Sequence, residues 1–206
     1  MTQHKGLIIY FDGPDGAGKT TQLNLAAEAL KKAGHEVIVT RTMGGTPIGE
    51  MLRQAMLTET SRPTETDLHI AVATQYALAD EVIKHRDKGH IVLIDRSPLS
   101  IIGYQVHGDG LDSELGYETV EDLLDLFTPN LLIIYEADID LLAERRSKRN
   151  QETQVDYFEN KPQDYHQKVA EGFGIAAKKF GATVIKADDS IESVHQATMS
   201  KIQTLL

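Results

Sequence analysis

The sequence predicts an α/β fold in which a five-stranded parallel sheet is covered by helices on both faces. Five short apolar segments alternate with segments of helical periodicity along the 206 residues, and this alternation is typical of parallel strands joined by helical crossovers. Residues 13–20 read Gly-Pro-Asp-Gly-Ala-Gly-Lys-Thr, which fits the phosphate-binding pattern G-x-x-x-x-G-K-[ST]. The motif lies between an apolar run and a helical segment, and this context predicts a P-loop NTPase fold.

Several residues in the first half of the chain are typical of helix starts and helix ends. Gly34 ends the helix that follows the glycine loop. Thr46 and Pro47 are typical of the cap and first position of a second helix. Thr64 and Asp67 have the spacing of a capping box at the start of a third, long helix. The elements expected here are strands at 7–11 and 36–40 and helices at 21–32, 47–57 and 64–88.

The second half continues the alternation. A buried strand ends in Asp95, a helical stretch continues to about Val106, and residues 107–110 read as a turn. Asp189 and Glu192 have capping spacing before the last helix. The remaining elements expected are strands at 91–95, 131–135 and 182–186 and helices at 118–127, 138–149, 164–180 and 189–206.

Length and composition limit the classes of protein to consider. A chain of 206 residues suits one domain spanning 1–206. The net charge of −10 argues against nucleic-acid binding, which requires a basic surface. There is no cysteine, no signal-peptide pattern and no apolar run long enough to cross a membrane. We therefore expect a cytoplasmic protein with small-molecule ligands.

The glycine loop indicates a nucleotide site. Backbone N–H groups of such a loop surround phosphate oxygens at a helix N-terminus, where the helix dipole favours anions. Lys19 is expected to reach the β- and γ-phosphates of ATP, and the Thr20 hydroxyl to bind Mg²⁺. The residues expected to bind the cofactor are Gly13, Asp15, Gly16, Ala17, Gly18, Lys19, Thr20 and Thr21.

Asp95 and Arg96 stand at the end of the third strand. Ligands of open α/β sheets bind at the carboxyl edge of the strands, so both side chains are expected in the same crevice as Lys19. A carboxylate at this position is the second nucleotide-binding element of P-loop proteins. Asp95 is therefore the second expected Mg²⁺ ligand beside Thr20.

Several motifs together resemble the thymidylate kinase family. Residues 11–22 resemble its P-loop, and Gly44-Gly45-Thr46-Pro47-Ile48-Gly49-Glu50 resembles its second glycine motif. A third set, Asp95-Arg96 with Ser100 and Tyr104-Gln105, also resembles this family. The resemblance extends over nearly the whole chain, and the combination is far more specific than the P-loop alone.

The resemblance implies transfer of the ATP γ-phosphoryl group to a nucleoside monophosphate, with dTMP or a related deoxynucleotide as the expected acceptor, in a homodimer. It implies that the acceptor phosphate is held by Arg41 and Arg96, whose planar forks suit bidentate contacts. The family also places arginines in a mobile lid, here near 145–162. The residues implied in catalysis are Lys19, Arg96, Arg145 and Arg149; those implied in acceptor binding are Asp15, Arg41, Ile70, Thr74, Arg96, Ser100, Tyr104 and Gln105.

These assignments have structural alternatives. The basic run 145–149, which also includes Arg146, can complement the dipole at a helix C-terminus, and Arg41 can be an ordinary surface residue after a strand. Asp95 can cap a helix. Tyr104 on a helix can serve core packing.

The chain departs from the family pattern at three places. Thr42 and Met43 replace a carboxylate and a proline in the second motif, and Ser97 replaces an aromatic. Counting back from the third strand, the family's base-stacking aromatic falls at Ile70 and a phosphate-binding arginine at Thr74, one helical turn apart. These changes predict weaker binding of the acceptor phosphate and the loss of a stacking platform for the base, and they leave another deoxynucleotide open as the acceptor.

Two other functions stay open at this stage. A deoxynucleoside kinase needs a general base for a neutral acceptor hydroxyl, but Arg41-Thr42 occupies the position where that family carries a glutamate. A nucleotide-binding regulator without transfer is favoured by the altered acceptor helix and disfavoured by the complete P-loop. A GTPase is excluded because no N-K-x-D motif follows a strand.

Overall fold

The computed structural model describes residues 6–58, 61–150, 157–158 and 160–206. It confirms the predicted α/β class: five strands form one sheet of order β2-β3-β1-β4-β5, in which every neighbouring pair is parallel. The strands are β1 (Leu7–Asp12), β2 (Val37–Arg41), β3 (Ile91–Asp95), β4 (Leu131–Glu136) and β5 (Thr183–Lys186).

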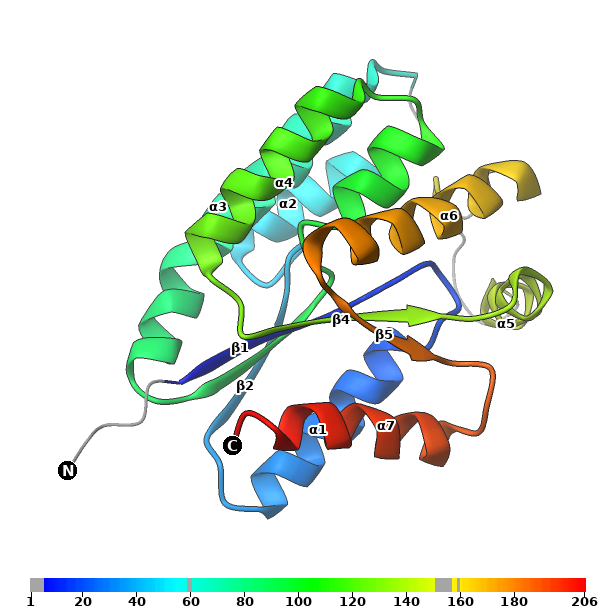
Figure 1. Ribbon diagram of the computed structural model, residues 1–206. Helices are drawn as coiled ribbons and strands as arrows, with labels where there is room; N and C mark the ends of the chain where they lie inside the picture. The colour runs from blue at the N-terminus through cyan, green and yellow to red at the C-terminus, as the bar shows by residue number, and fades with distance from the viewer. Residues whose placement is uncertain (1–5, 59–60, 151–156, 159) are drawn as a thin grey trace.

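Helices cover both faces of the sheet (Figure 1). They are α1 (Lys19–Lys32), α2 (Pro47–Leu57), α3 (Thr64–Asp87), the π-helix η1 (Ile102–Gly108), α4 (Ser113–Phe127), α5 (Ile139–Asn150), α6 (Gln163–Phe180) and α7 (Ile191–Gln203). Helices α1 and α7 lie on one face, whereas α3, α4 and α6 lie on the other, and α2 packs against α3.

The strand sequences explain this two-sided core. Alternate residues of a strand point to opposite faces. Ile9 and Phe11 of β1 accordingly belong to the apolar cluster formed with α1 and α7, whereas Ile8 and Tyr10 belong to the cluster formed with α3. All four side chains are completely buried. Because this central strand is buried on both faces, both sets of alternating side chains are apolar, which explains the continuous apolar run in the sequence.

Helix starts were predicted with mixed success. Thr46 caps α2, since its hydroxyl accepts a hydrogen bond from the Gly49 N–H at 3.0 Å, as expected. The predicted capping box of α3 is wrong: Pro63 holds the cap position, and Asp67 instead pairs with Arg62.

The starts of α4 and α7 also differ from the prediction. Helix α4 begins at Ser113 rather than near Glu118, because the Asp112 side chain accepts a hydrogen bond from the Leu115 N–H at 3.0 Å and stabilises an earlier start. Helix α7 is capped by Ser190 and not by Asp189.

The segment after β3 is a π-helix, which the sequence did not indicate. It packs closely along α6: the rings of Tyr104 and Phe173 meet edge to face, with centroids 5.8 Å apart. This approach depends on glycine, because a Cβ at Gly103 would lie 2.8 Å from the Phe173 ring. Single π-turns often occur at functional sites, and this one orients Tyr104 and Gln105.

No helix in the described residues is long and apolar enough to cross a membrane.

Candidate active site

The loop after β1 has the backbone conformation that phosphate binding requires. Gly13, Gly16 and Gly18 have φ angles of 137°, 90° and 82°, which side-chain-bearing residues rarely adopt. A Cβ at Gly13 would lie 2.4 Å from the Tyr135 carbonyl oxygen. Helix α1 then begins at Lys19, and no side chain in the described part of the chain caps it. Its first N–H groups therefore suit the phosphates of a nucleotide.

Lys19 is held inside the site. Its side chain is 7% exposed, its ammonium donates a hydrogen bond to the Pro14 carbonyl at 2.9 Å, and it lies 3.7 Å from Asp15 Oδ1. Burial, together with the charge of Arg96, lowers its pKa. The lysine thus has little conformational freedom before it meets a phosphate.

Thr20 and Asp95 come together as the sequence predicted for a metal pair. The Thr20 hydroxyl donates a hydrogen bond to Asp95 Oδ2 at 2.7 Å, although the two residues are 75 positions apart. A hydroxyl and a carboxylate are hard oxygen ligands of the kind that Mg²⁺ takes from proteins, with water and phosphates completing the octahedron. The residues present therefore fit this ion.

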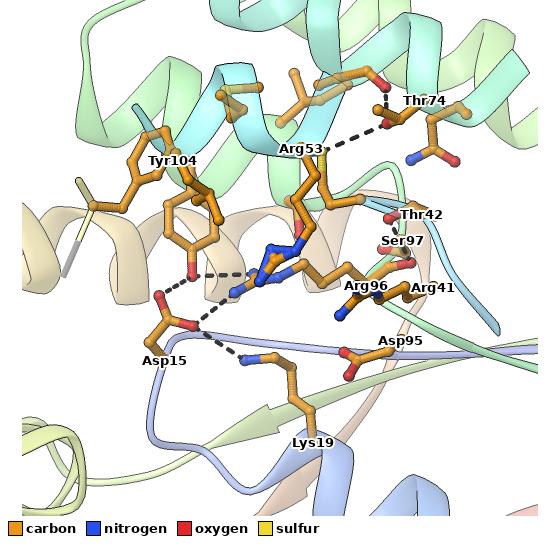
Figure 2. A pocket seen from close by; sticks show the side chains of 18 of the residues that line it. Asp15, Lys19, Arg41, Thr42, Arg53, Thr74, Asp95, Arg96, Ser97 and Tyr104 are labelled. Carbon is orange, nitrogen blue, oxygen red and sulfur yellow. Dashed lines mark hydrogen bonds and ion pairs between the residues drawn. The ribbon is translucent and has the colours of Figure 1, made fainter. Parts of the chain in front are cut away.

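Asp15, Arg96 and Tyr104 form a closed hydrogen-bonded triangle (Figure 2). Arg96 donates to Asp15 at 2.6 Å and to the Tyr104 hydroxyl at 3.1 Å, and that hydroxyl donates to Asp15 at 2.8 Å. Burial alone raises the pKa of a carboxyl group, but Arg96, Lys19 and the Tyr104 hydrogen bond hold the pKa of Asp15 below its ordinary value. Asp15 therefore stays ionised and fixes the guanidinium of Arg96.

Arg96 adopts a left-handed backbone conformation, with φ of 67°. This backbone conformation costs on the order of 1–3 kcal/mol, so it persists only where neighbouring residues hold the chain in place. Asp12 holds the chain after Arg96 in place. Its buried carboxylate accepts hydrogen bonds from the Ser97 N–H and hydroxyl at 2.8 and 2.7 Å and from the Ser100 hydroxyl at 2.9 Å. Burial raises the pKa of Asp12 even so.

Asp12 was missed in the sequence interpretation. The available signal was a carboxylate directly before the first P-loop glycine, Gly13, together with two serines, Ser97 and Ser100, after the Asp-Arg pair. Ser97 looked like a mere departure from the family pattern. In the structure its N–H and hydroxyl donate hydrogen bonds to Asp12, which connects the end of β1 to the turn after β3.

These groups surround a cavity of about 490 Å³ at the carboxyl edge of β1, β2 and β3. Figure 2 shows Lys19 and Asp95 at one end and Thr74 at the other, with Arg53 and Arg96 between them. The cations that line the cavity are Lys19, Arg41, Arg53, Arg96 and Arg149. A volume of several hundred Å³ is typical of a small-molecule site.

Arg41 and Arg53 bring positive charge from β2 and α2. Arg41 lines the cavity and donates a hydrogen bond to Glu50 at 2.6 Å. Arg53, which was missed, follows Glu50 by one helical turn and so shares its face of α2. That spacing was the signal available in the sequence.

Helix α3 contributes Ala71, Thr74 and Gln75 to the cavity. The Thr74 hydroxyl donates to the Ala71 carbonyl at 2.7 Å. Ile70 does not line the cavity but packs, half-buried, against the core cluster beside it. Counting residues along the helix gave Ile70 where Ala71 lines the cavity, whereas Thr74 lines it as expected, with Gln75 beside it.

The predicted lid residues are only partly brought together. Arg149 lines the cavity. Arg145 instead donates a hydrogen bond to the Ala187 carbonyl at 2.9 Å, and Arg146, 6% exposed, donates to the Asp15 carbonyl at 3.2 Å. Residues 151–156 and 159 of the predicted lid lie outside the described residues.

The other residues predicted for the site lie in the cavity wall, in the core or on the surface of α1. Ser100, Tyr104 and Gln105 line the cavity, and Phe158 closes it next to Tyr104, with ring centroids 5.9 Å apart. Ala17 is buried and packs with the α1 side of the core. Thr21 is exposed on the first turn of α1.

A parallel sheet with a P-loop, a hydroxyl–carboxylate pair beside it and further arginines along the same cavity is the arrangement of a nucleotide kinase, a phosphotransferase. The family model described as thymidylate kinase matches residues 11–198. The chain belongs to the thymidylate kinase family. This membership confirms the resemblance and does not favour a deoxynucleoside kinase or a regulator without transfer activity.

Individual relatives agree with this membership. The chain is 32% identical to a thymidylate kinase of Halothermothrix orenii, over 98% of this chain and 99% of the relative. It is 31% identical to one from Geobacillus thermodenitrificans, over 98% and 91%. The crystal structure of thymidylate kinase from Ehrlichia chaffeensis superposes with a TM-score of 0.73 at 27% identity, covering 96% of this chain and 98% of that one.

Proposed function

We propose that the protein transfers the γ-phosphoryl group of ATP to the phosphate of dTMP, with Mg²⁺ as the metal ion. The observation that carries this proposal is one cavity with two kinds of phosphate-binding group. The P-loop with Lys19 lies at one end, and Arg41, Arg53 and Arg96 lie beyond it. The relatives' names identify thymidylate as the acceptor.

The donor end is suited to a nucleoside triphosphate with its metal. The glycine loop and the N-terminus of α1 cradle the phosphates, and Lys19 neutralises their charge. Thr20 and Asp95, 2.7 Å apart, would hold Mg²⁺. When bound, the metal ion would supply positive charge that offsets the charge of the phosphates.

The acceptor end holds a phosphate and a deoxyribose. The fork of Arg96 is oriented by Asp15 and Tyr104, so it meets the acceptor phosphate without first losing rotamer freedom. Asp15 also accepts from the sugar hydroxyl, and Tyr104 lies against the ring and disfavours a 2′-hydroxyl. Ser100 and Gln105 complete this wall of the cavity.

Catalysis in this arrangement is mostly positioning and charge neutralisation. Two polyanions have to approach each other, and each bound cation lowers that repulsion. Arg149, which belongs to the predicted lid, adds a cation from the end of α5.

A homodimer is part of the same proposal. Apolar side chains on α2 and α3 are strongly exposed: Ile48 is 58%, Met51 70% and Tyr76 57% exposed. Helices α2 and α3 pack together, and Ile48 and Met51 lie about one helical turn apart on α2. Covering them with the same helices of a second copy buries apolar area on both chains. Residence in the cytoplasm stays a prediction from the sequence.

The test is an acceptor panel. Purified protein with ATP and Mg²⁺ is offered each deoxynucleoside, each ribonucleoside and their monophosphates, and ADP release is followed with identification of the product. We expect dTMP to give the highest kcat/KM and Lys19→Ala to abolish transfer. Preference for a free nucleoside, or ATP binding without transfer to any acceptor, would contradict the proposal.

A further inference from the structure

Gln75 carries a buried polar atom whose partner is missing from the described chain. Its side chain is 3% exposed, it lines the cavity, and its Oε1 atom accepts no hydrogen bond from any described residue. Three other side-chain atoms share this property, on Tyr10, Gln22 and His195, but none of these residues lines the cavity.

A buried acceptor without a partner destabilises the folded protein, so its presence calls for a physical reason. A ligand that supplies the missing donor is one such reason. Thr74, the neighbouring polar group on α3, already donates to the Ala71 carbonyl at 2.7 Å. The side chains around this end of the cavity are otherwise largely apolar and include Met43, Met56 and Ile101.

The position of Gln75 selects the part of the ligand it meets. The phosphate-binding cations and the Asp15–Tyr104 pair occupy the part of the cavity nearer the P-loop, and Thr74 marks the opposite end (Figure 2). An acceptor nucleotide with its phosphate on Arg96 and its sugar on Asp15 therefore points its base at α3. A flat base fits between apolar side chains, and its polar edge requires a polar partner.

We propose that Gln75 selects the acceptor base by hydrogen bonding to its Watson–Crick edge. A side-chain amide presents one acceptor and one donor in a plane, which matches an edge with an adjacent N–H and carbonyl. In thymine the N3–H donates to Oε1 and O4 accepts from the amide NH₂. This inference rests on the proposed function, because that function supplies the nucleotide.

The test is a double-mutant cycle between protein and ligand. Wild type and Gln75→Met are compared with dTMP and with dTMP methylated at N3, and kcat/KM is measured for all four pairs. We expect methylation to lower kcat/KM of the wild type by about tenfold or more, since the hydrogen bond is lost and Oε1 stays buried without a partner. Gln75→Met should lose most of this discrimination, because it has no acceptor to leave unpaired.

Gln75→Met also has a predicted effect on stability. Replacing an unpaired buried amide by an apolar side chain of similar size should leave the melting temperature of the ligand-free protein unchanged or raised. The increase in melting temperature on addition of dTMP should become smaller than in the wild type. Gln75→Leu provides the same comparison if the methionine variant does not fold.

Gln22 offers a matched control. It is also buried, at 2% exposed, with an unpaired Oε1, but it lies on α1 outside the cavity and donates to the Ile191 carbonyl at 3.0 Å. Gln22→Met should leave the ratio of kcat/KM for dTMP over its N3-methyl form as in the wild type. Equal discrimination by wild type and Gln75→Met would overturn the role of Gln75.

The two proposals fail in distinguishable ways. If the wild type prefers another deoxynucleoside monophosphate to dTMP, the proposed acceptor is wrong, and the cycle is run with that nucleotide and its form methylated on the Watson–Crick N–H. Loss of discrimination in Gln75→Met then still supports the assignment of Gln75. If no monophosphate binds or reacts, both proposals are overturned.

Discussion

Arg96 Nη2 and Asp15 Oδ1 lie 2.6 Å apart, and this pair joins the turn after β3 to the P-loop. The Arg96 side chain is 26% exposed and that of Asp15 is 11% exposed, so the pair is only weakly screened by water. Tyr104 bonds to both partners and limits the rotation of the guanidinium. The acceptor phosphate therefore meets an arginine whose direction is already set.

Arg96→Lys tests whether this planar fork matters beyond its charge. Lysine keeps the positive charge but lacks the planar fork whose fixed directions serve Asp15, Tyr104 and a phosphate together. We expect kcat to fall by about 10³-fold, the lower end of the effect of removing an arginine that stabilises phosphoryl transfer. Steady-state kinetics with both nucleotides measures this.

Arg86→Lys is the control for that experiment. Arg86 also makes a forked contact, to Asp87 at 2.9 and 2.8 Å, at the C-terminal end of α3 and outside the cavity. Its substitution should leave kcat within a factor of about two, because this ion pair lies outside the cavity. Less than a tenfold loss in Arg96→Lys would show that charge alone is sufficient.

Asp15 predicts a specific dependence of stability on pH. Its folded pKa lies below its ordinary value, so its ionised form stabilises the fold at pH above the unfolded pKa of about 4. This contribution is lost as the pH falls through the folded pKa. The difference in unfolding free energy between wild type and Asp15→Asn should therefore be constant near pH 7 and shrink as the pH is lowered below about 5. Urea titrations at several pH values measure this difference, and a difference independent of pH would contradict it.

The fold was predictable because its determinants are local. Apolar runs such as 91–95 become central strands, and Gly34, Thr46 and Pro47 mark helix ends at short range. The errors at helix starts arise where neighbouring residues compete for the same role. Thr64 and Asp67 have capping spacing, but Pro63 holds the cap position of α3 and Asp67 pairs with Arg62.

The site was predictable where a motif fixes the backbone and less so where packing fixes a side chain. The P-loop and Asp95 fall as expected because they end buried strands of one parallel sheet. Which face of α3 meets the cavity depends on the rotation of the helix against the sheet. A count along the sequence cannot determine that rotation, and it selected Ile70 in place of Ala71.

Asp95→Asn tests the metal pair. The amide keeps the size of the side chain but removes the negative charge that attracts Mg²⁺, so the Mg²⁺ concentration for half-maximal activity should rise about tenfold or more. A magnesium titration at fixed ATP measures this shift. Asp87→Asn, an exposed carboxylate outside the cavity, is the matched control. An unchanged Mg²⁺ dependence in Asp95→Asn would remove this residue from the metal site.

Tyr76→Lys tests the proposed dimer. Tyr76 is 57% exposed on α3, and a lysine in an apolar interface is costly to desolvate. We expect the wild type to be a dimer at micromolar concentration in light scattering and the variant to shift toward monomer. Val184→Lys, on the edge strand β5 with 42% exposure, should leave the dimer intact. A wild type that is monomeric throughout would contradict the dimer.

Arg145 and Arg149 separate the two interpretations of the basic run at the end of α5. Arg149 lines the cavity, whereas Arg145 donates to the Ala187 carbonyl at 2.9 Å and so connects α5 to the segment after β5. Arg149→Met should lower kcat by about 10³-fold or more, with little change in melting temperature, because it removes a cation beside the transferring phosphoryl group. Arg145→Met should instead destabilise the fold by about 1–3 kcal/mol, since a hydrogen bond from a charged donor is lost, and should leave kcat nearly unchanged. Thermal melts and steady-state kinetics on both variants distinguish these effects, and the reverse pattern would show that Arg145 moves to the phosphates during turnover.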